Sequence, residues 1–341
     1  MYKTRVRTWH KPRYQMSHLP TLVFIPGSWH KPNCYDKITT LLQNEHNLKC
    51  VSITLPSTVG NPNVTFKDDM DAARHAISSE MAQTRDIIVI AHSYGGMVGN
   101  SAIKGLTQPI ASKTSTGPHP SRPGPGYVRA LVLIASGFTI TGLSFMDPLF
   151  GVPPPSWRIN RASGYAELVV DPHKLFYHDL SDDEANYRVS QLTTQSLKAS
   201  FEGGEHAYAG WQDVPTWYIG TIEDKGLPVA LQRMQVGMAR GYGSAIHHTE
   251  LRSSHSPFLS MPDEVAGVIL EAVREVSGEQ ILVEGASRGD GRKSGKVHAA
   301  PMARLVAPRT WFIFGIPFSI GRVLGWGLWA FTELRKIYRR G

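Results

Sequence analysis

The segment that most constrains this chain is the pentapeptide Ala-His-Ser-Tyr-Gly at 91–95, followed by Gly96. Residues 86–90 are an apolar run typical of a buried strand, and residues 97–104 begin like a helix. A serine at a sharp strand-to-helix turn with small neighbours is the nucleophile elbow, in which a strained backbone exposes the serine oxygen. We therefore predict that Ser93 is a nucleophile.

The match to the G-x-S-x-G pattern is incomplete, because Ala91 stands where the pattern has glycine. Small residues such as Gly95 are needed at the elbow because a bulky side chain would collide with the crossing strand and helix. A motif this short also arises by chance. The rest of the chain must therefore supply a base, an acid and an oxyanion hole.

Apolar runs and helical periodicities alternate along most of the chain. Strands are predicted at 21–26, 49–54, 86–91, 127–134, 217–219 and 245–251, and helices at 66–83, from 94, at 231–238 and at 258–276. This alternation predicts an α/β fold with a mostly parallel sheet flanked by helices on both faces. The more polar and aromatic stretch at about 141–213 interrupts it, and we interpret that stretch as an inserted, mainly helical cap.

Charge is distributed unevenly along the 341 residues. Residues 1–15 carry five Lys or Arg and no acid, and residues 279–341 carry eleven Lys or Arg and four acids. The net charge of +8 therefore belongs to the ends, since residues 16–278 hold 20 basic and 24 acidic residues, a net charge of −4. A nucleic-acid-binding core is not expected from this balance. The two cysteines, Cys34 and Cys50, suggest neither a disulfide framework nor a metal site.

Candidates for the base and the acid follow the serine in the order Ser, acid, His that this fold uses. Asp224 follows the predicted strand 217–219, at the sheet edge where such folds bind ligands. His255 lies in the loop after strand 245–251. Serine needs such a base and an acid to orient it, because its hydroxyl is a weak nucleophile near neutral pH.

Other residues compete for these two roles. Glu223 is adjacent to Asp224 and is the alternative acid. His247 and His248 are alternative bases, although both lie inside a predicted strand, where at most one faces the ligand crevice. We favour Asp224 and His255.

An oxyanion hole needs two backbone N–H groups aimed at the developing charge. One is expected from Tyr94, the residue after the nucleophile, and the other from Ser28 in the turn after the first core strand. Gly27 would allow that turn to approach the substrate closely.

With these motifs in order, residues 16–277 resemble the α/β-hydrolase superfamily, and in particular its small esterase branch of plant methylesterases, hydroxynitrile lyases and fungal homologues. The matching segments are 24–29, 91–96, 218–228 with Gln232, and 254–260 with Pro262, while 176–181 is similar to fungal members. The chain departs from the branch at Pro26, where members often have His, and at Ala91. Hydroxynitrile lyases have Thr at the place of Gly27 and Lys at the place of Ser256, so the resemblance implies hydrolysis rather than cyanohydrin cleavage.

Both ends need a separate interpretation. Residues 1–15 form a basic N-terminal extension before a catalytic domain at 16–278, and residues 279–308, rich in Gly, Ser and charge, are typical of a linker. Residues 309–341 form an apolar tail flanked by basic residues. Arg322 near its middle makes spanning a membrane costly, and its glycines weaken a helix in water. A surface anchor is expected ahead of a full span, and the alternative is a segment that packs on the catalytic domain.

These observations predict a serine hydrolase that cleaves a carboxylic ester or lactone of a small apolar molecule through an acyl-enzyme, with no cofactor or metal. Trp29, Trp157 and Trp211 are candidates for the pocket wall, and core packing is their alternative role. The same triad would serve a tailoring enzyme of secondary metabolism that closes lactones or cleaves C–C bonds, and the fold also suits a non-catalytic ligand-binding protein. We expect a cytoplasmic protein with a small-molecule substrate, no nucleic acid partner and a membrane surface as the candidate partner of residues 309–340.

Overall fold

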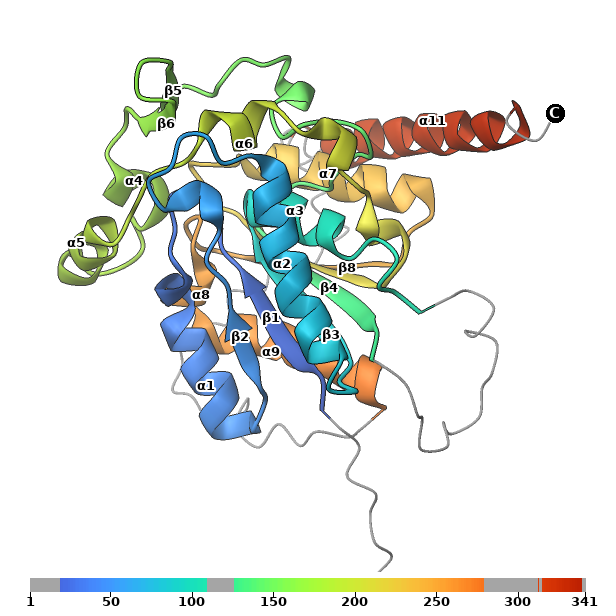
Figure 1. Cartoon of the computed structure of the whole chain (residues 1–341), viewed down its shortest axis with the longest axis horizontal. Coiled ribbons are helices and arrows are strands. Elements are labelled where there is room, and N and C mark those ends of the chain that lie inside the picture. Colours follow the sequence, from blue (N-terminus) through green and yellow to red (C-terminus); the bar gives the residue numbers. More distant parts are fainter. Residues whose placement is uncertain (1–18, 109–125, 279–311, 313–314, 339–341) are drawn as a thin grey trace, which may run out of the picture.

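The computed structural model describes residues 19–108, 126–278, 312 and 315–338 (Figure 1). The predicted extension at 1–15 and the predicted linker at 279–308 lie outside the described residues, as do residues 309–311 at the start of the predicted tail.

Six strands form one sheet in the order β2-β1-β3-β4-β7-β8, and every neighbouring pair is parallel. The strands are β1 (Thr21–Ile25), β2 (Cys50–Ser52), β3 (Ile87–His92), β4 (Val128–Ile134), β7 (Thr216–Thr221) and β8 (Ile246–Leu251). This is the parallel sheet that the apolar runs predict. Because the strands are parallel, the carboxyl ends of β3, β7 and β8 meet at one edge of the sheet.

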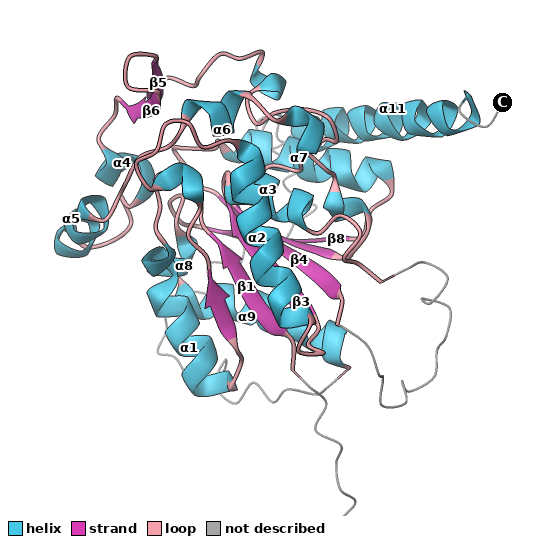
Figure 2. Cartoon of the chain, viewed as in Figure 1, coloured by secondary structure: helices cyan, strands magenta, loops and turns pink. Residues whose placement is uncertain are grey.

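Helices cover both faces of the sheet (Figures 1 and 2). One face packs against α2 (Phe66–Met81), α3 (Gly95–Ala102) and α7 (Val229–Tyr242), and the other against α1 (Asp36–His46) and α9 (Pro262–Ser277). Successive strand residues point to opposite faces, so Val23 contributes to the first core and Phe24 to the second. The strands are continuously apolar because both faces of the sheet are buried.

The helix α2 shows how local sequence defines an element. Thr65 caps its first turn by accepting from Asp68 N, and the Asp68 side chain accepts from Thr65 N in return. This capping box satisfies two of the unpaired donors of the first turn. Phe66, Ala73 and Ile77 then recur at helical spacing and are fully buried.

The single helix predicted at 258–276 is wrong in one respect, because the structure divides it into α8 (Pro257–Ser260) and α9 (Pro262–Ser277). Met261 between them has a non-helical backbone, with φ of −137° and ψ of 54°. Proline disfavours helical geometry in the residue before it and has no N–H to donate. Pro262 therefore ends the first helix and starts the second.

The chain between β4 and β7 forms a cap over the carboxyl edge of the sheet. It contains the short helices α4 (Pro172–Phe176), α5 (Asp182–Ser190) and α6 (Leu197–Phe201). It also contains an antiparallel hairpin of β5 (Trp157–Asn160) and β6 (Tyr165–Leu168), which the sequence did not predict. The fold is therefore the predicted α/β-hydrolase architecture with a hairpin added to its helical cap.

The tail forms the helix α11 (Ile316–Tyr338), which lies along α7 and projects beyond the sheet (Figure 1). No described helix is long and apolar enough to cross a membrane. The glycines that sequence reasoning treated as weakening a helix have a packing role. A Cβ at Gly237 would lie 2.5 Å from Phe318 O, and one at Gly321 or Gly325 would overlap the backbone of α7. Small residues at this spacing let two helix backbones approach closely.

Candidate active site

The turn between β3 and α3 has the strained geometry of a nucleophile elbow. Ser93 has φ of +51°, in the left-handed region that non-glycine residues rarely adopt. Its N–H donates to Ile134 O at 3.1 Å, which ties the turn to the neighbouring strand β4. The side chain is partly exposed although both flanking residues are buried. The backbone therefore directs the Ser93 hydroxyl out of the core.

Small residues around the elbow are required by close backbone contacts. A Cβ at Gly95 would lie 2.6 Å from Ile25 O, and one at Gly96 would overlap the side chain of Ser136. Ala91 is accommodated where the pattern has glycine, and its Cβ is 3.3 Å from the place a Cβ would take at Gly99. These contacts explain the motif physically: α3 crosses β1 with no room for side chains between them.

His255 and Asp224 meet at the same edge of the sheet. The Nδ1 of His255 lies 2.7 Å from Asp224 Oδ2, and both side chains are almost fully buried. The carboxylate can only accept, so Nδ1 carries the proton and Nε2 remains the basic nitrogen. This arrangement is the one in which an acid orients an imidazole as a general base.

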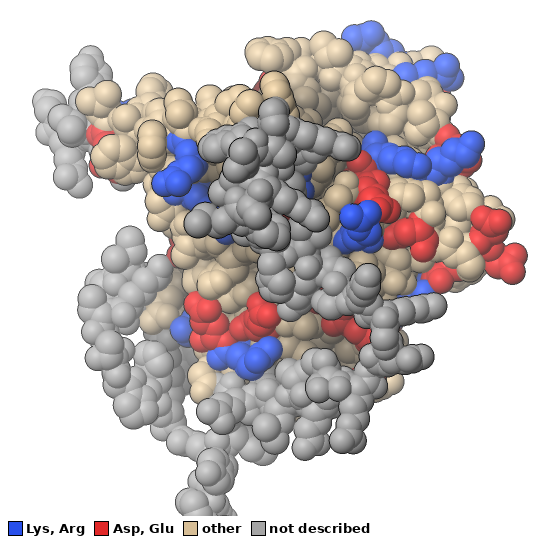
Figure 3. Space-filling view, turned by 180° about the vertical axis from the view of Figure 1, so that it is seen from behind, with Lys and Arg blue, Asp and Glu red and all other residues tan. Residues whose placement is uncertain are grey.

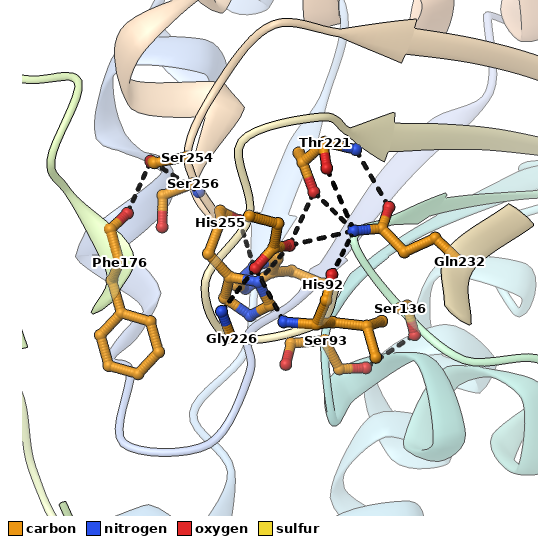
Figure 4. A network of polar contacts seen from close by, with 12 residues as sticks. His92, Ser93, Ser136, Phe176, Thr221, Gly226, Gln232, Ser254, His255 and Ser256 are labelled. Atoms are coloured by element: carbon orange, nitrogen blue, oxygen red, sulfur yellow. Dashed lines mark hydrogen bonds and ion pairs between the residues drawn. The ribbon is translucent and has the colours of Figure 1, made fainter. Parts of the chain in front are cut away.

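Asp224 is itself held by several donors, and Figure 4 shows three of the donor residues, Thr221, Gly226 and Gln232, near His255. Its Oδ1 accepts from the N–H groups of Gly226 and Leu227 at 2.7 and 2.8 Å. Its Oδ2 accepts from Thr221 Oγ1 at 2.7 Å and from Gln232 Nε2 at 3.2 Å. Five hydrogen bonds, counting that of His255, hold the carboxylate and fix its orientation. Gln232 belongs to a segment that carries the family resemblance, but sequence reasoning gave it no role.

The competing candidates lie elsewhere. Glu223 is partly exposed and pairs with Arg252 at 3.1 Å. His247 stacks on Trp217 with 4.4 Å between ring centroids, and about half of its side chain is exposed. His248 is largely buried near Glu250, and desolvation lowers its pKa to about 4. Of these residues only Asp224 contacts His255, so the structure brings the favoured acid and base together.

Ser93 lies on the elbow beside this pair, and Figure 4 shows Ser93 and His255 in the same polar cluster. Within the described residues, His255 hydrogen-bonds Asp224 and His92, and none of these bonds joins it to Ser93. Hydrogen bonds between a catalytic nucleophile and its base are often loose in the free enzyme and tighten when substrate binds.

The expected oxyanion donors are two backbone N–H groups, one in the loop after β1 and one on the elbow. Neither Ser28 N nor Tyr94 N donates to an acceptor within the described part of the chain, although both residues are buried. Buried N–H groups without partners are rare, and backbone N–H groups left free to donate are what an oxyanion hole requires. Trp29, directly after Ser28, has φ of +63° and so turns the backbone sharply there.

A Cβ at Gly27 would lie 3.0 Å from Ser93 Cβ and 3.1 Å from His92 Nδ1, so this loop lies directly against the elbow. This is tighter than ordinary carbon contacts, and Gly27 therefore keeps the loop close to the nucleophile. The approach of this turn to substrate, predicted for Gly27, stays a prediction.

Two further histidines, missed by sequence reasoning, hold the site together. His92 Nε2 donates to His255 O at 2.9 Å, joining the elbow to the loop of the base. His30 Nδ1 donates to Ser28 O at 2.7 Å and its Nε2 accepts from Tyr177 OH at 2.8 Å. Burial lowers the pKa of His30 to about 4 and that of His92 well below its usual range, so both rings are neutral at pH 7. His92 could have been noticed because it lies inside the elbow motif.

Tyr94 is anchored below the elbow by a buried acid. Its hydroxyl donates to Asp69 Oδ2 at 2.8 Å, and Asp69 Oδ1 accepts from Ser57 N at 2.8 Å. Burial raises the pKa of Asp69 to about 6. The backbone that carries one expected oxyanion donor is thus connected through its own side chain to α2.

The cap contributes to the loop that carries His255. Asp179 Oδ2 accepts from Ser254 N at 2.8 Å, and Ser254 Oγ donates to Phe176 O at 2.7 Å. The Phe176 ring lies 5.6 Å from the His255 ring and 6.2 Å from the ring of Trp29. An aromatic wall therefore stands beside the base.

The three tryptophans proposed for the pocket separate into two groups. Trp157 lies 6.3 Å from Trp29 and extends the aromatic wall into the cap. Trp211 is fully buried against Phe138, and its Nε1 donates to Thr139 O. Trp211 is therefore a core residue, as the alternative interpretation had it.

Metal ligation finds no support among the described residues, which include no cluster of three or more His, Cys, Asp or Glu suited to hold an ion. The side chains gathered at this edge of the sheet are those of an acid, a base and a hydroxyl nucleophile. Their arrangement suits acyl transfer by acid–base and nucleophilic chemistry.

The chain belongs to the alpha/beta hydrolase family, whose sequence model matches residues 22–268. It is 26% identical over 268 residues to the alpha/beta hydrolase nvfD of Aspergillus novofumigatus. The aligned region covers 77% of this chain and 99% of that protein. The family resemblance inferred from the motifs is thereby confirmed.

Two solved structures extend the comparison. Polyneuridine aldehyde esterase aligns with a TM-score of 0.55 at 17% identity, over 74% of this chain and 98% of its own. Methylesterase MES16 from Arabidopsis aligns with a TM-score of 0.53 at 16% identity, over 75% of this chain and 99% of its own. At these identities the likeness establishes the common fold.

Proposed function

We propose that this hydrolase is a serine esterase that cleaves a carboxylic ester or lactone of a small apolar molecule. The observation that carries the proposal is the pairing of His255 with a fully hydrogen-bonded Asp224 beside a serine with φ of +51°. The esterase names of two structural neighbours agree with it.

In the proposed reaction Ser93 Oγ attacks the substrate carbonyl, and His255 Nε2 takes the hydroxyl proton. Asp224 stabilises the imidazolium that forms, and the N–H groups of Ser28 and Tyr94 stabilise the oxyanion. His255 then returns the proton to the leaving alcohol, which departs and leaves an acyl group on Ser93. Water, deprotonated by His255, hydrolyses this ester and frees the acid.

An apolar substrate is supported by the aromatic wall of Phe176, Trp29 and Trp157 next to the base. Aromatic walls with a few polar groups are typical of small-molecule sites, because apolar surface supplies affinity and polar groups fix orientation. Burying the apolar part of the substrate would hold its carbonyl close to Ser93.

The direct test is labelling of the purified full-length protein with a fluorophosphonate probe, which reacts with activated serines. We expect the wild type and Ser190→Ala, an exposed serine of α5, to be labelled equally, and Ser93→Ala and His255→Ala to remain unlabelled. A wild type that is folded by circular dichroism but unlabelled would contradict the proposal.

Substrate class is then tested with a panel of small apolar esters and lactones, analysed by mass spectrometry. The proposal expects the free acid and alcohol, with 18O from labelled water in the acid. A probe-reactive Ser93 that yields only cyclised or C–C-cleaved products would instead identify the enzyme as a tailoring catalyst.

A further inference from the structure

The helix α11 carries an apolar surface that the catalytic site does not use. Its large apolar side chains are between 49% and 66% exposed at seven positions. These are Ile320, Val323, Leu324, Trp326, Trp329, Phe331 and Leu334. Contiguous exposed apolar surface of this kind is uncommon on soluble monomers and marks an interaction site.

Five of these seven exposed residues form a stripe rather than a scatter, and Trp326 and Trp329 lie outside it. At about 100° per residue, the five non-tryptophan members fall within an arc of roughly 100°. Gly321 and Gly325, which contact α7, lie on a different side of the helix. In the view from behind, the projecting part of α11 is mostly uncharged (Figure 3).

Docking on α7 holds this stripe outward. The two helices meet backbone to backbone at their glycines, and Tyr242 OH of α7 lies 3.2 Å from Thr332 Oγ1 of α11. The stripe therefore cannot turn inward to be buried against the sheet without giving up these contacts.

The charge of the tail indicates which kind of partner the exposed surface of α11 would bind. Residues 316–341 contain five Lys or Arg and one acid, and four of these cations occur at Arg335, Lys336, Arg339 and Arg340. Arg322 is exposed and lies over the Trp326 ring, 5.8 Å from its centroid. Apolar side chains, tryptophans and cations together are the composition of helices that lie in the interface of an anionic bilayer. A second copy of this helix would match the apolar stripe but would repeat its positive charge.

We propose that α11 is a docking surface for a membrane that contains anionic lipids. The helix lies in the plane of the interface with Ile320, Leu324 and Phe331 of the stripe inserted, and the exposed Arg335 near its end contacts lipid phosphates and carboxylates. It does not cross the bilayer, because Arg322 lies near its middle and no described helix has the apolar length to span. This anchor does not depend on the esterase activity proposed above.

The test is sedimentation of the full-length protein with sucrose-loaded vesicles at 150 mM salt. One set contains phosphatidylcholine alone and the other contains 30% phosphatidylserine. We expect binding to the anionic vesicles to be at least about fivefold tighter, since each cation near such a surface strengthens binding by about that factor. The triple variant Ile320→Glu/Leu324→Glu/Phe331→Glu should bind at least about tenfold more weakly.

A matched control carries the same three added charges elsewhere. Val59→Glu/Val169→Glu/Tyr187→Glu alters apolar residues that are also more than half exposed, but outside α11. It should retain binding within about threefold, and circular dichroism should show both variants folded. Equal loss in the two variants, or no binding of the wild type to either vesicle, would overturn the proposal. A dimer by light scattering that the α11 variant disrupts, without vesicle binding, would assign the stripe to a second copy instead.

Discussion

In two regions of this molecule, glycines let two backbone segments pack closely together, and the close packing has a different role in each region. At the elbow, Gly95 and Gly96 let α3 cross β1 and contact Ser136. At the junction of α7 and α11, Gly237 and Gly321 let two helices touch. The elbow is surrounded by buried polar groups that fix a strained serine, whereas α11 has one docked side and an exposed apolar stripe. Close packing at glycine therefore supports a precise site in one region and an outward-facing surface in the other.

The largest effect is expected on the catalytic side of this comparison. Asp224→Asn should lower kcat/KM by about 10⁴-fold, because an amide cannot hold the Nδ1–H tautomer of His255 as a carboxylate does. Glu223→Gln, which alters the neighbouring surface ion pair, should stay within about twofold. Steady-state hydrolysis of the best ester substrate measures both. Equal losses in the two variants would show that the acid has been misassigned.

The two glycine regions are compared directly by Gly95→Ala and Gly325→Ala. At Gly95 the added methyl must displace β1 or the elbow, so we expect kcat/KM to fall about 100-fold and stability by about 1–3 kcal/mol. At Gly325 the methyl displaces α11. We therefore expect stability to fall by the same amount or less, while kcat/KM stays within about twofold. Kinetics and urea unfolding distinguish them. A comparable loss of kcat/KM in Gly325→Ala would show that the α7–α11 junction and the active site are functionally coupled.

The buried acid behind the elbow predicts a pH dependence of stability. Burial raises the pKa of folded Asp69 from 3.8 to about 6, so its protonated form is favoured in the native state. Relative to Asp69→Asn, the wild-type free energy of unfolding should fall by about 3 kcal/mol as pH rises from about 3 to about 7, and then stay level. Urea titrations of both proteins over this range measure it. Parallel curves would mean that Asp69 titrates normally.

The smallest effect is expected at the α7–α11 junction. Tyr242→Phe removes the hydrogen bond to Thr332, and α11 docking should weaken by about 0.5–1.5 kcal/mol. Faster amide hydrogen exchange confined to α11 would report this. Thr332→Val, which removes the other partner of the same bond, should give a matching increase. Slower hydrolysis in either variant would show that the tail supports the active site.

Much of the fold and site could be predicted because the signals are local. Apolar runs mark buried strands, and the elbow motif depends on steric limits within a few residues of Ser93. The cap hairpin β5–β6 was missed, since its two strands are short and gain stability from each other and from the cap. The helix break at Met261 was also missed, although Pro262 was a visible signal.

The sequence by itself determined the order of strands and helices, the position of the strained serine and a short list of acids and bases. Tertiary structure decided among them, because the loops after β7 and β8 come together only in the fold, where Asp224 rather than Glu223 contacts His255. It also gave His30 and His92 their roles, since their partners Tyr177 and His255 are more than 140 residues away. Similarly, the glycines of α11 weaken an isolated helix but strengthen this one, because a second backbone lies against them.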